Sequence, residues 1–218
     1  MTTDLRPDLE SLRAAVTAFG GFTGADRASA ALALATAPRP DLTVPAHRRA
    51  LLAWLNSWGC RIRYPRPGEP DLFDLSVGAW WTRRRHALPD EDTALSALTD
   101  EAIAELGECY EDLAAAQVGS PARPRALGPT AASKLLHALR PKALMPWDEA
   151  IADHLHGARD AAAYTAHQRL GRAWATGLLA EAGVDEEELA DRLGRPGRPL
   201  AKMLDDYCYL RFTRLESG

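Results

Sequence analysis

One stretch of the chain, residues 128–148, holds residue types and spacings that could carry out chemistry. Gly128 and Pro129 form a turn from which a helix can start, and Asp148 follows a later helix break. The N-terminus of a helix presents unpaired N–H groups and the positive end of the helix dipole, so it can hold a phosphate group. The stretch therefore predicts one carboxylate close to a phosphate-binding turn.

Positive charge gathers around the same stretch. No acidic residue lies between Gly119 and Lys142, although the formal net charge of the chain is −4. We interpret this window as a phosphate-contacting surface, because such contacts position a protein on a nucleic acid without reading its sequence. The candidate contact residues are Gly128, Thr130, Ser133, Lys134, Arg123 and Arg125. A solvated loop and helix face is the competing interpretation.

Two prolines predict the helices that position the carboxylate. Pro141 cannot continue the first helix, which we expect to end near Leu139. Pro146 is expected to open the next helix, with Trp147 and Asp148 in its first turn. Trp147 is then a candidate wall of a pocket. An acid in a first turn also has a purely structural explanation, because the helix dipole alone favours it by ~0.3–1 kcal/mol.

The remainder of the chain is predicted to be helical throughout. β-branched residues are sparse, and apolar residues recur at helical spacing between proline and glycine breaks. The other expected helices cover about 8–19, 23–37, 45–58, 71–86, 99–118, 160–182, 185–193 and 199–213. The fold class is therefore a compact all-α protein of about nine helices. We expect a single domain over residues 1–218, and two lobes would divide near 89–92.

Composition narrows the class of protein further. The chain is 46% hydrophobic and 26% charged, which excludes wholesale disorder. Its acidic balance argues against a bulk nucleic-acid binder, so a local basic patch matters more. Three widely spaced cysteines offer neither a disulfide framework nor a metal-binding pair, which suits a reducing cytoplasm. The first residues lack the apolar core of a signal peptide, and no apolar run is long enough to cross a membrane. We expect a cytoplasmic protein without membrane contact.

Residues 126–151 resemble the active-site segment of the helix-hairpin-helix DNA glycosylases. In that family a glycine-rich hairpin leads into a helix, and an aspartate follows about one helix and one turn later, after a proline. With Ala132 at the alanine of the family's helix-opening triplet, Gly128 falls on the second hairpin glycine and Asp148 on the catalytic aspartate. The whole chain, including Trp-Leu-Asn-Ser-Trp-Gly-Cys at 54–60, is also similar to bacterial proteins to which we can assign no activity.

The resemblance implies a monofunctional DNA N-glycosylase that acts on a flipped base through Asp148, with DNA as partner and no metal or other cofactor. Thr130 replaces the lysine of the bifunctional branch, so Schiff-base lyase chemistry is not implied. Ala126 replaces the first hairpin glycine, and no four-cysteine cluster is present. These departures favour the alternative of a degenerate module that binds DNA or a protein partner. An unrelated small-molecule enzyme that uses the same cleft is a third alternative.

Several other residues are of types that could take part in binding or catalysis. His137 could border the cleft as a ligand or base, although a packed histidine explains it as well. His154 and His156 diverge on a helix and so do not form a metal site. Trp80 and Trp81, followed by Arg83 to Arg85, could stack a base, but at most one indole is expected to face the core. Asp205 and Asp206 are interpreted as acids opposite a core stripe, and hence as structure.

Overall fold

The computed structural model describes residues 5–19, 24–120 and 122–213. Over these residues the chain forms ten α-helices, and the only β-type pairing is an isolated bridge between Gln117 and Ala126. The all-α class expected from the sequence is confirmed. The helices are α1 (Leu9–Ala18), α2 (Gly24–Ala35), α3 (Pro45–Ser57), α4 (Leu72–Arg84), α5 (Asp100–Ala114), α6 (Pro129–Leu139), α7 (Glu149–His156), α8 (Ala161–Ala182), α9 (Glu186–Arg192) and α10 (Leu200–Cys208).

Side-chain caps fix most helix starts. A side-chain oxygen immediately before the helix accepts a hydrogen bond from a backbone N–H of the first turn, which satisfies a group that has no partner within the helix. The residues that do so are Asp8, Asp71, Thr99, Asp148, Asp160 and Asp185. At the other end, Gly183 closes α8 with a φ of 66°, a left-handed conformation that glycine adopts without strain. The expected glycine closure at 20–21 and cap at 23 lie outside the described residues.

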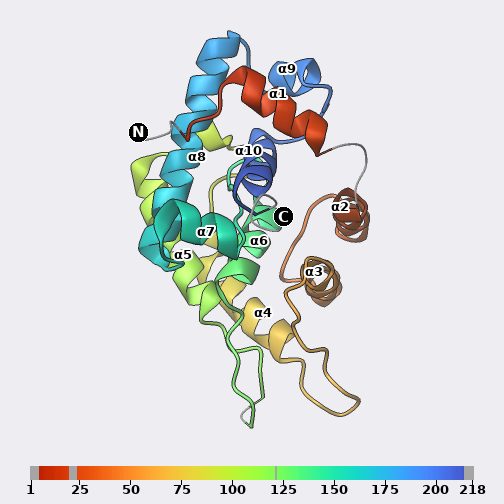
Figure 1. Cartoon of the computed structure of the whole chain (residues 1–218). Coiled ribbons are helices and arrows are strands. Elements are labelled where there is room, and N and C mark those ends of the chain that lie inside the picture. Colours follow the sequence, from red (N-terminus) through yellow and green to blue (C-terminus); the bar gives the residue numbers. More distant parts are fainter. Residues whose placement is uncertain (1–4, 20–23, 121, 214–218) are drawn as a thin grey trace.

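The longest helix, α8, forms one side of the molecule. It packs against α5, α7 and α10, and also against α1 and α9. Figure 1 shows α2 and α3 on the opposite side, with α6 and α10 between them and α8. α2 packs on α3, and α3 in turn contacts α4 and α6. None of the described helices combines the length and the apolar character needed to cross a bilayer.

Aromatic side chains fill the interior beneath α6 and α7. Trp80, Trp147, Tyr110 and Tyr164 are among the largest fully buried side chains. The rings of Tyr110 and Tyr164 stack with centroids 4.2 Å apart, and Trp147 meets both rings edge-on. Such contacts fix the segment that leads into α7, because each aromatic ring buries a large apolar area.

Two expectations about buried faces are wrong. The apolar spacing of residues 71–86 predicts that Leu75 points inward from this helix, but 58% of its surface is exposed. Trp80 and Trp81 are both buried, with exposed fractions of 0% and 8%, so neither indole is free to stack on a base. The Trp80 indole N–H donates to the carbonyl oxygen of Cys109 at 3.0 Å, which ties α4 to α5.

Candidate functional site

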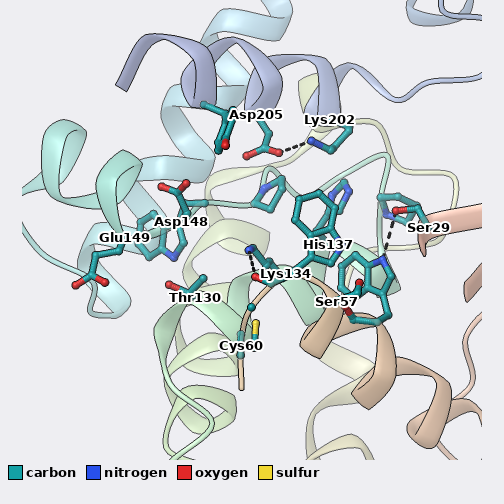
Figure 2. A pocket seen from close by; sticks show the side chains of 18 of the residues that line it. Ser29, Ser57, Cys60, Thr130, Lys134, His137, Asp148, Glu149, Lys202 and Asp205 are labelled. Carbon is teal, nitrogen blue, oxygen red and sulfur yellow. Dashed lines mark hydrogen bonds and ion pairs between the residues drawn. The ribbon is translucent and has the colours of Figure 1, made fainter. Parts of the chain in front are cut away.

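A cavity of about 1190 Å³ lies among α2, α3, α6, α10 and the start of α7. It is referred to below as the cleft, and Figure 2 shows the side chains around it. Four of the sequence-predicted phosphate contacts line it together with Asp148: Arg125, Gly128, Thr130 and Lys134. The fold therefore brings the two ends of the 128–148 stretch to one hollow.

The turn at Gly128 is built as the sequence predicted. Gly128 has a φ of 88°, which a residue with a side chain rarely adopts, and Pro129 opens α6. The backbone N–H of Gly128 donates to the carbonyl oxygen of Ala114 at 3.0 Å, which holds the turn to the end of α5. Thr130 and Ala131 follow in the first turn and line the cleft. First-turn N–H groups have no partner within their own helix, so this end of α6 can receive an anion.

The sequence predicted Asp148 within the first turn of α7. In the structure it lies immediately before the helix, as its cap. One of its carboxylate oxygens accepts a hydrogen bond from the backbone N–H of Ile151 at 2.9 Å. The hydroxyl of Thr213 donates to the other oxygen at 3.0 Å. Each oxygen can accept a second bond, and no ion pair to Asp148 is found within the described residues. Asp148 also borders a second hollow of about 700 Å³, so it separates two depressions.

Lys134 lines the cleft together with Asp148, and no carboxylate among the described residues pairs with it. Its ammonium group lies 5.0 Å from the centre of the Trp58 ring and 3.5 Å from the Trp58 carbonyl oxygen. A cation over an indole gains about 0.5–2 kcal/mol. Over the described part of the chain, no ion pair involves Lys134. Among the described residues that line the cleft, the acid Asp148 and the cations Lys134 and Arg125 are therefore not neutralised by a direct ion pair, and Arg125 donates to backbone carbonyl oxygens instead.

Other members of the predicted phosphate surface lie elsewhere. Ser133 is fully buried, and its hydroxyl accepts a hydrogen bond from the backbone N–H of Trp147 at 3.0 Å, so the expectation that it would contact phosphate is wrong. Arg140 is also buried and donates to the carbonyl oxygen of Pro89 at 2.5 Å. Arg125 lines the cleft edge, whereas Arg123 is exposed outside it. The basic window is therefore dispersed and does not form one surface.

The two predicted pocket residues lie at the back of the cleft. Trp147 is fully buried among aromatic rings, so it supports the floor beneath Asp148 and offers no exposed face for stacking. Burial lowers the pKa of His137 to about 4, so its imidazole is neutral near pH 7. The Nδ1 atom of His137 lies 2.7 Å from the carbonyl oxygen of Leu144. Since a carbonyl only accepts, Nδ1 carries the proton and Nε2 remains an acceptor.

Sequence reasoning missed the ionic wall formed by α10 and the turn before it. The ammonium group of Lys202 donates to the carboxylates of Asp205, at 2.5 Å, and Asp206. Arg198 bridges Asp206, at 2.6 Å, and Asp26 of α2, at 2.7 Å. Figure 2 shows Lys202 and Asp205 on the opposite side of the cavity from Lys134 and Thr130.

Burial shifts the pKa values of the charged groups in this wall. Desolvation raises the pKa of Asp205 in spite of the neighbouring Lys202. Desolvation also opposes the charge of Lys202, but Asp205 and Asp206 outweigh it and raise the pKa of the ammonium group. The expected core stripe of Leu204 and Tyr207 is present, yet the acids beside it are buried too. The expectation that Asp205 and Asp206 lie on a face opposite the core is therefore wrong, whereas their ion pairs agree with the interpretation of both acids as structural.

The histidines and cysteines do not assemble a metal centre in the part of the chain that the structure describes, where no group of three or more His, Cys, Asp or Glu side chains could hold an ion. His154 stacks on Phe212, with ring centroids 4.3 Å apart. His156 instead contacts His167 at 3.1 Å between ring nitrogens. Comparisons of the chain with protein-family models, with curated proteins and with solved structures give no match.

Proposed function

We propose that the protein is a monofunctional DNA N-glycosylase that hydrolyses the bond between a flipped base and its sugar. The observation that carries the proposal is the position of Asp148: a carboxylate without a cationic partner among the described residues, on a cleft of about 1190 Å³ that Gly128, Thr130 and Lys134 also line. A cleft of this size accommodates a nucleotide, since ligand pockets commonly measure ~300–1,000 Å³.

Each group has a role in the proposed reaction. The first-turn N–H groups of α6 and the ammonium group of Lys134 hold a backbone phosphate next to the flipped nucleotide. The bond between the sugar C1′ and the base nitrogen breaks, and positive charge develops on the sugar. The carboxylate of Asp148 stabilises that charge, which is worth most in a site that excludes water. A water molecule then supplies hydroxide to C1′ and its proton leaves with the base. The product is an abasic site in an intact strand.

A second function, a binding module without catalysis, is favoured by the pairing of most charges around the cleft. Glu149 pairs with Arg159, Asp26 with Arg198 and Asp205 with Lys202. Asp148 itself caps α7, a structural task that needs no substrate. Such a module binds DNA in a salt-dependent way and releases no base.

Base release from damaged duplexes tests the proposal. Duplexes that carry alkylated, deaminated or oxidised bases are incubated with the protein, and abasic sites are revealed as alkali-labile breaks. Asp148→Asn is expected to lower the rate by about 100-fold or more, in the range typical of a lost catalytic group. Asparagine caps helices as well as aspartate does, so the variant keeps its fold.

Asp185→Asn is the matched control. Asp185 caps α9 in the same way, accepting from the backbone N–H of Glu188 at 2.9 Å, and it does not line the cleft. Unchanged activity in this variant separates the chemistry of Asp148 from a general effect of losing a cap carboxylate. Wild-type protein that binds duplex DNA without releasing any base overturns the glycosylase and supports the binding module.

A further inference from the structure

Two long loops, residues 59–70 and the described residues 116–120 and 122–127, project from the same end of the molecule (Figure 1). Together they carry five arginines and a single acid, Glu69, in a chain whose net charge is −4. All five arginines are exposed. We name this group the arginine tip; it consists of Arg61, Arg63, Arg66, Arg123 and Arg125.

The roots of the two loops are fastened to each other. The guanidinium group of Arg125 donates to the carbonyl oxygens of Cys60, at 2.9 Å, and Arg61. Arg61 has a φ of 51°, and among the described residues it is the one non-glycine residue with a positive φ. A non-glycine residue in this conformation persists only where its surroundings hold it. Arg125 supplies that restraint, so the first loop is held in a fixed relation to the second.

Further contacts make both loops rigid near their roots. The side-chain amide of Asn56 bonds both backbone groups of Ile62, at 2.7 and 2.8 Å. Gly119 sits so close to the return of its loop that a Cβ atom would lie 2.4 Å from the carbonyl oxygen of Arg123. The two loops that carry the exposed guanidinium groups are therefore braced at their roots, and such restraint lowers the entropy cost of binding.

The arginine tip is continuous with the cleft. Cys60 and Arg125, at the roots of the two loops, both line the cleft. Tyr64, between the arginines of the first loop, leaves 51% of its surface exposed. Cations interleaved with an exposed aromatic ring are typical of nucleic-acid-binding surfaces, because arginine binds phosphate in bidentate fashion and the ring packs on sugars or bases.

We infer that the arginine tip grips the phosphates of a DNA duplex on the strand that flanks the cleft. The choice of DNA as the polyanion rests on the proposed function, whereas the surface itself rests on the charges and contacts of the two loops. Each phosphate neutralised by an arginine makes binding more sensitive to salt.

The test compares two triple variants that remove the same charge. The first, Arg61→Gly, Arg66→Ser and Arg123→Ser, takes three cations from the arginine tip, and glycine suits the positive φ of residue 61. The control, Arg13→Gln, Arg49→Gln and Arg83→Gln, removes three exposed arginines from α1, α3 and α4. Binding of an undamaged fluorescent duplex is measured between 50 and 200 mM salt, with circular dichroism as a check on folding.

The arginine-tip variant is expected to reduce the slope of log affinity against log salt by up to about 3, while the control keeps the wild-type slope. Over the fourfold change from 50 to 200 mM salt, the wild type then loses affinity by a factor up to about 60 times larger than the variant does. Equal slopes for the two triple variants overturn the inference. The inference is also overturned if the arginine-tip variant lowers the salt slope for an RNA duplex but not for the DNA duplex. That result would assign the surface to RNA.

The inference and the proposed function fail separately. If base release persists and the arginine-tip variant binds duplex DNA like the control, the inference is wrong and the proposed enzyme activity still stands. If duplex binding depends on the arginine tip but the wild type releases no base, the proposed enzyme activity is wrong and the inference still stands.

Discussion

At the scale of single residues, Asp148 caps α7, and under the proposed function the same carboxylate would also serve the chemistry. The N–H of Ile151 and the hydroxyl of Thr213 hold its carboxylate in one orientation. A group fixed in this way needs no reorganisation when charge develops nearby, which is the condition for electrostatic catalysis. The same bonds would be present in a protein without catalysis, so the chemical role depends on the cleft that the carboxylate borders.

Lys202 allows the ionic wall to be tested at one residue. It is the only ion-pair partner of Asp205 in the described chain, and both side chains are largely buried. Lys202→Met keeps the length of the side chain but leaves Asp205 buried without a cation. We expect the free energy of unfolding at pH 7 to fall by about 3–5 kcal/mol, as when one partner of a buried pair is removed. Urea denaturation measures this change.

The pH dependence of the Lys202→Met effect identifies its cause. In the unfolded chain Asp205 is charged above its ordinary pKa of about 4. In the folded variant without Lys202, its carboxyl must either take up a proton or stay charged in a buried position, and both cost free energy. The loss of stability should therefore shrink as the pH falls towards 4. Arg49→Gln, at an exposed position on α3, is expected to change stability by about 0.5 kcal/mol or less. A Lys202→Met protein as stable as this control would contradict the assigned network.

At the scale of elements, buried imidazoles tie α6, α8 and the 144–147 segment together. Burial lowers the pKa of His137 to about 4 and that of His167 to about 3. The unfolded chain, with ordinary values near 6.5, then binds more protons than the folded chain below that pH. Stability is therefore fully present above pH 6.5 and is lost as the pH falls towards 4 and 3. Each imidazole contributes a slope of up to about 1.4 kcal/mol per pH unit.

Urea denaturation between pH 7 and pH 5 measures the slope. His167→Gln is expected to flatten it, because glutamine does not titrate, whereas His86→Gln at an exposed position should leave it unchanged. Comparison between variants is needed because burial raises the pKa of Asp205 and Glu186, which changes stability in the opposite direction. Parallel slopes for wild type and His167→Gln would rule out the buried imidazole as the source.

Helix starts could be predicted from the sequence where their chemistry is local. The helix expected from residue 160 starts there, with Asp160 as its cap, and Pro129 opens α6 as expected. The start of α7 could not be predicted from Pro146, because distant side chains take the backbone groups before it. Gln168 bonds the N–H of Met145 at 3.0 Å, and Ser133 bonds the N–H of Trp147. These contacts keep 145–147 extended, so the helix begins only after Asp148.

At the scale of the whole molecule, the candidate site divides into a half that local sequence encodes and a half that it does not. Gly128, Lys134 and Asp148 are linked by one helix and one turn, so their proximity follows from spacing. Asp26 and Arg198, by contrast, are 172 residues apart along the chain and meet only when α2 packs beside the turn before α10. The spacing of apolar residues along the sequence carries no information about such a contact. The ionic wall was therefore absent from the sequence prediction.

The Asp26–Arg198 ion pair joins α2 to the other wall of the cleft, and its removal should loosen that wall alone. Among the described elements, α2 packs mainly on α3. Asp26→Ala removes the bridge, whereas Arg198 keeps Asp206 at 2.6 Å and is not left unpaired. Backbone amides of α2 are then expected to exchange with deuterium several-fold faster, because local opening needs less free energy than global unfolding.

Amides of α5 and α8, which pack closely against each other, should exchange at the wild-type rate in the same experiment. Ser29→Ala is the matched control within α2, because it removes only the long 3.3 Å bond from the Trp54 indole N–H. If exchange accelerates equally in α2, α5 and α8, the ion pair contributes to the stability of the whole fold. If α2 is unaffected, packing on α3 alone holds the cleft closed. Acceleration confined to α2 would show that the Asp26–Arg198 ion pair holds this helix in place against the other wall of the cleft.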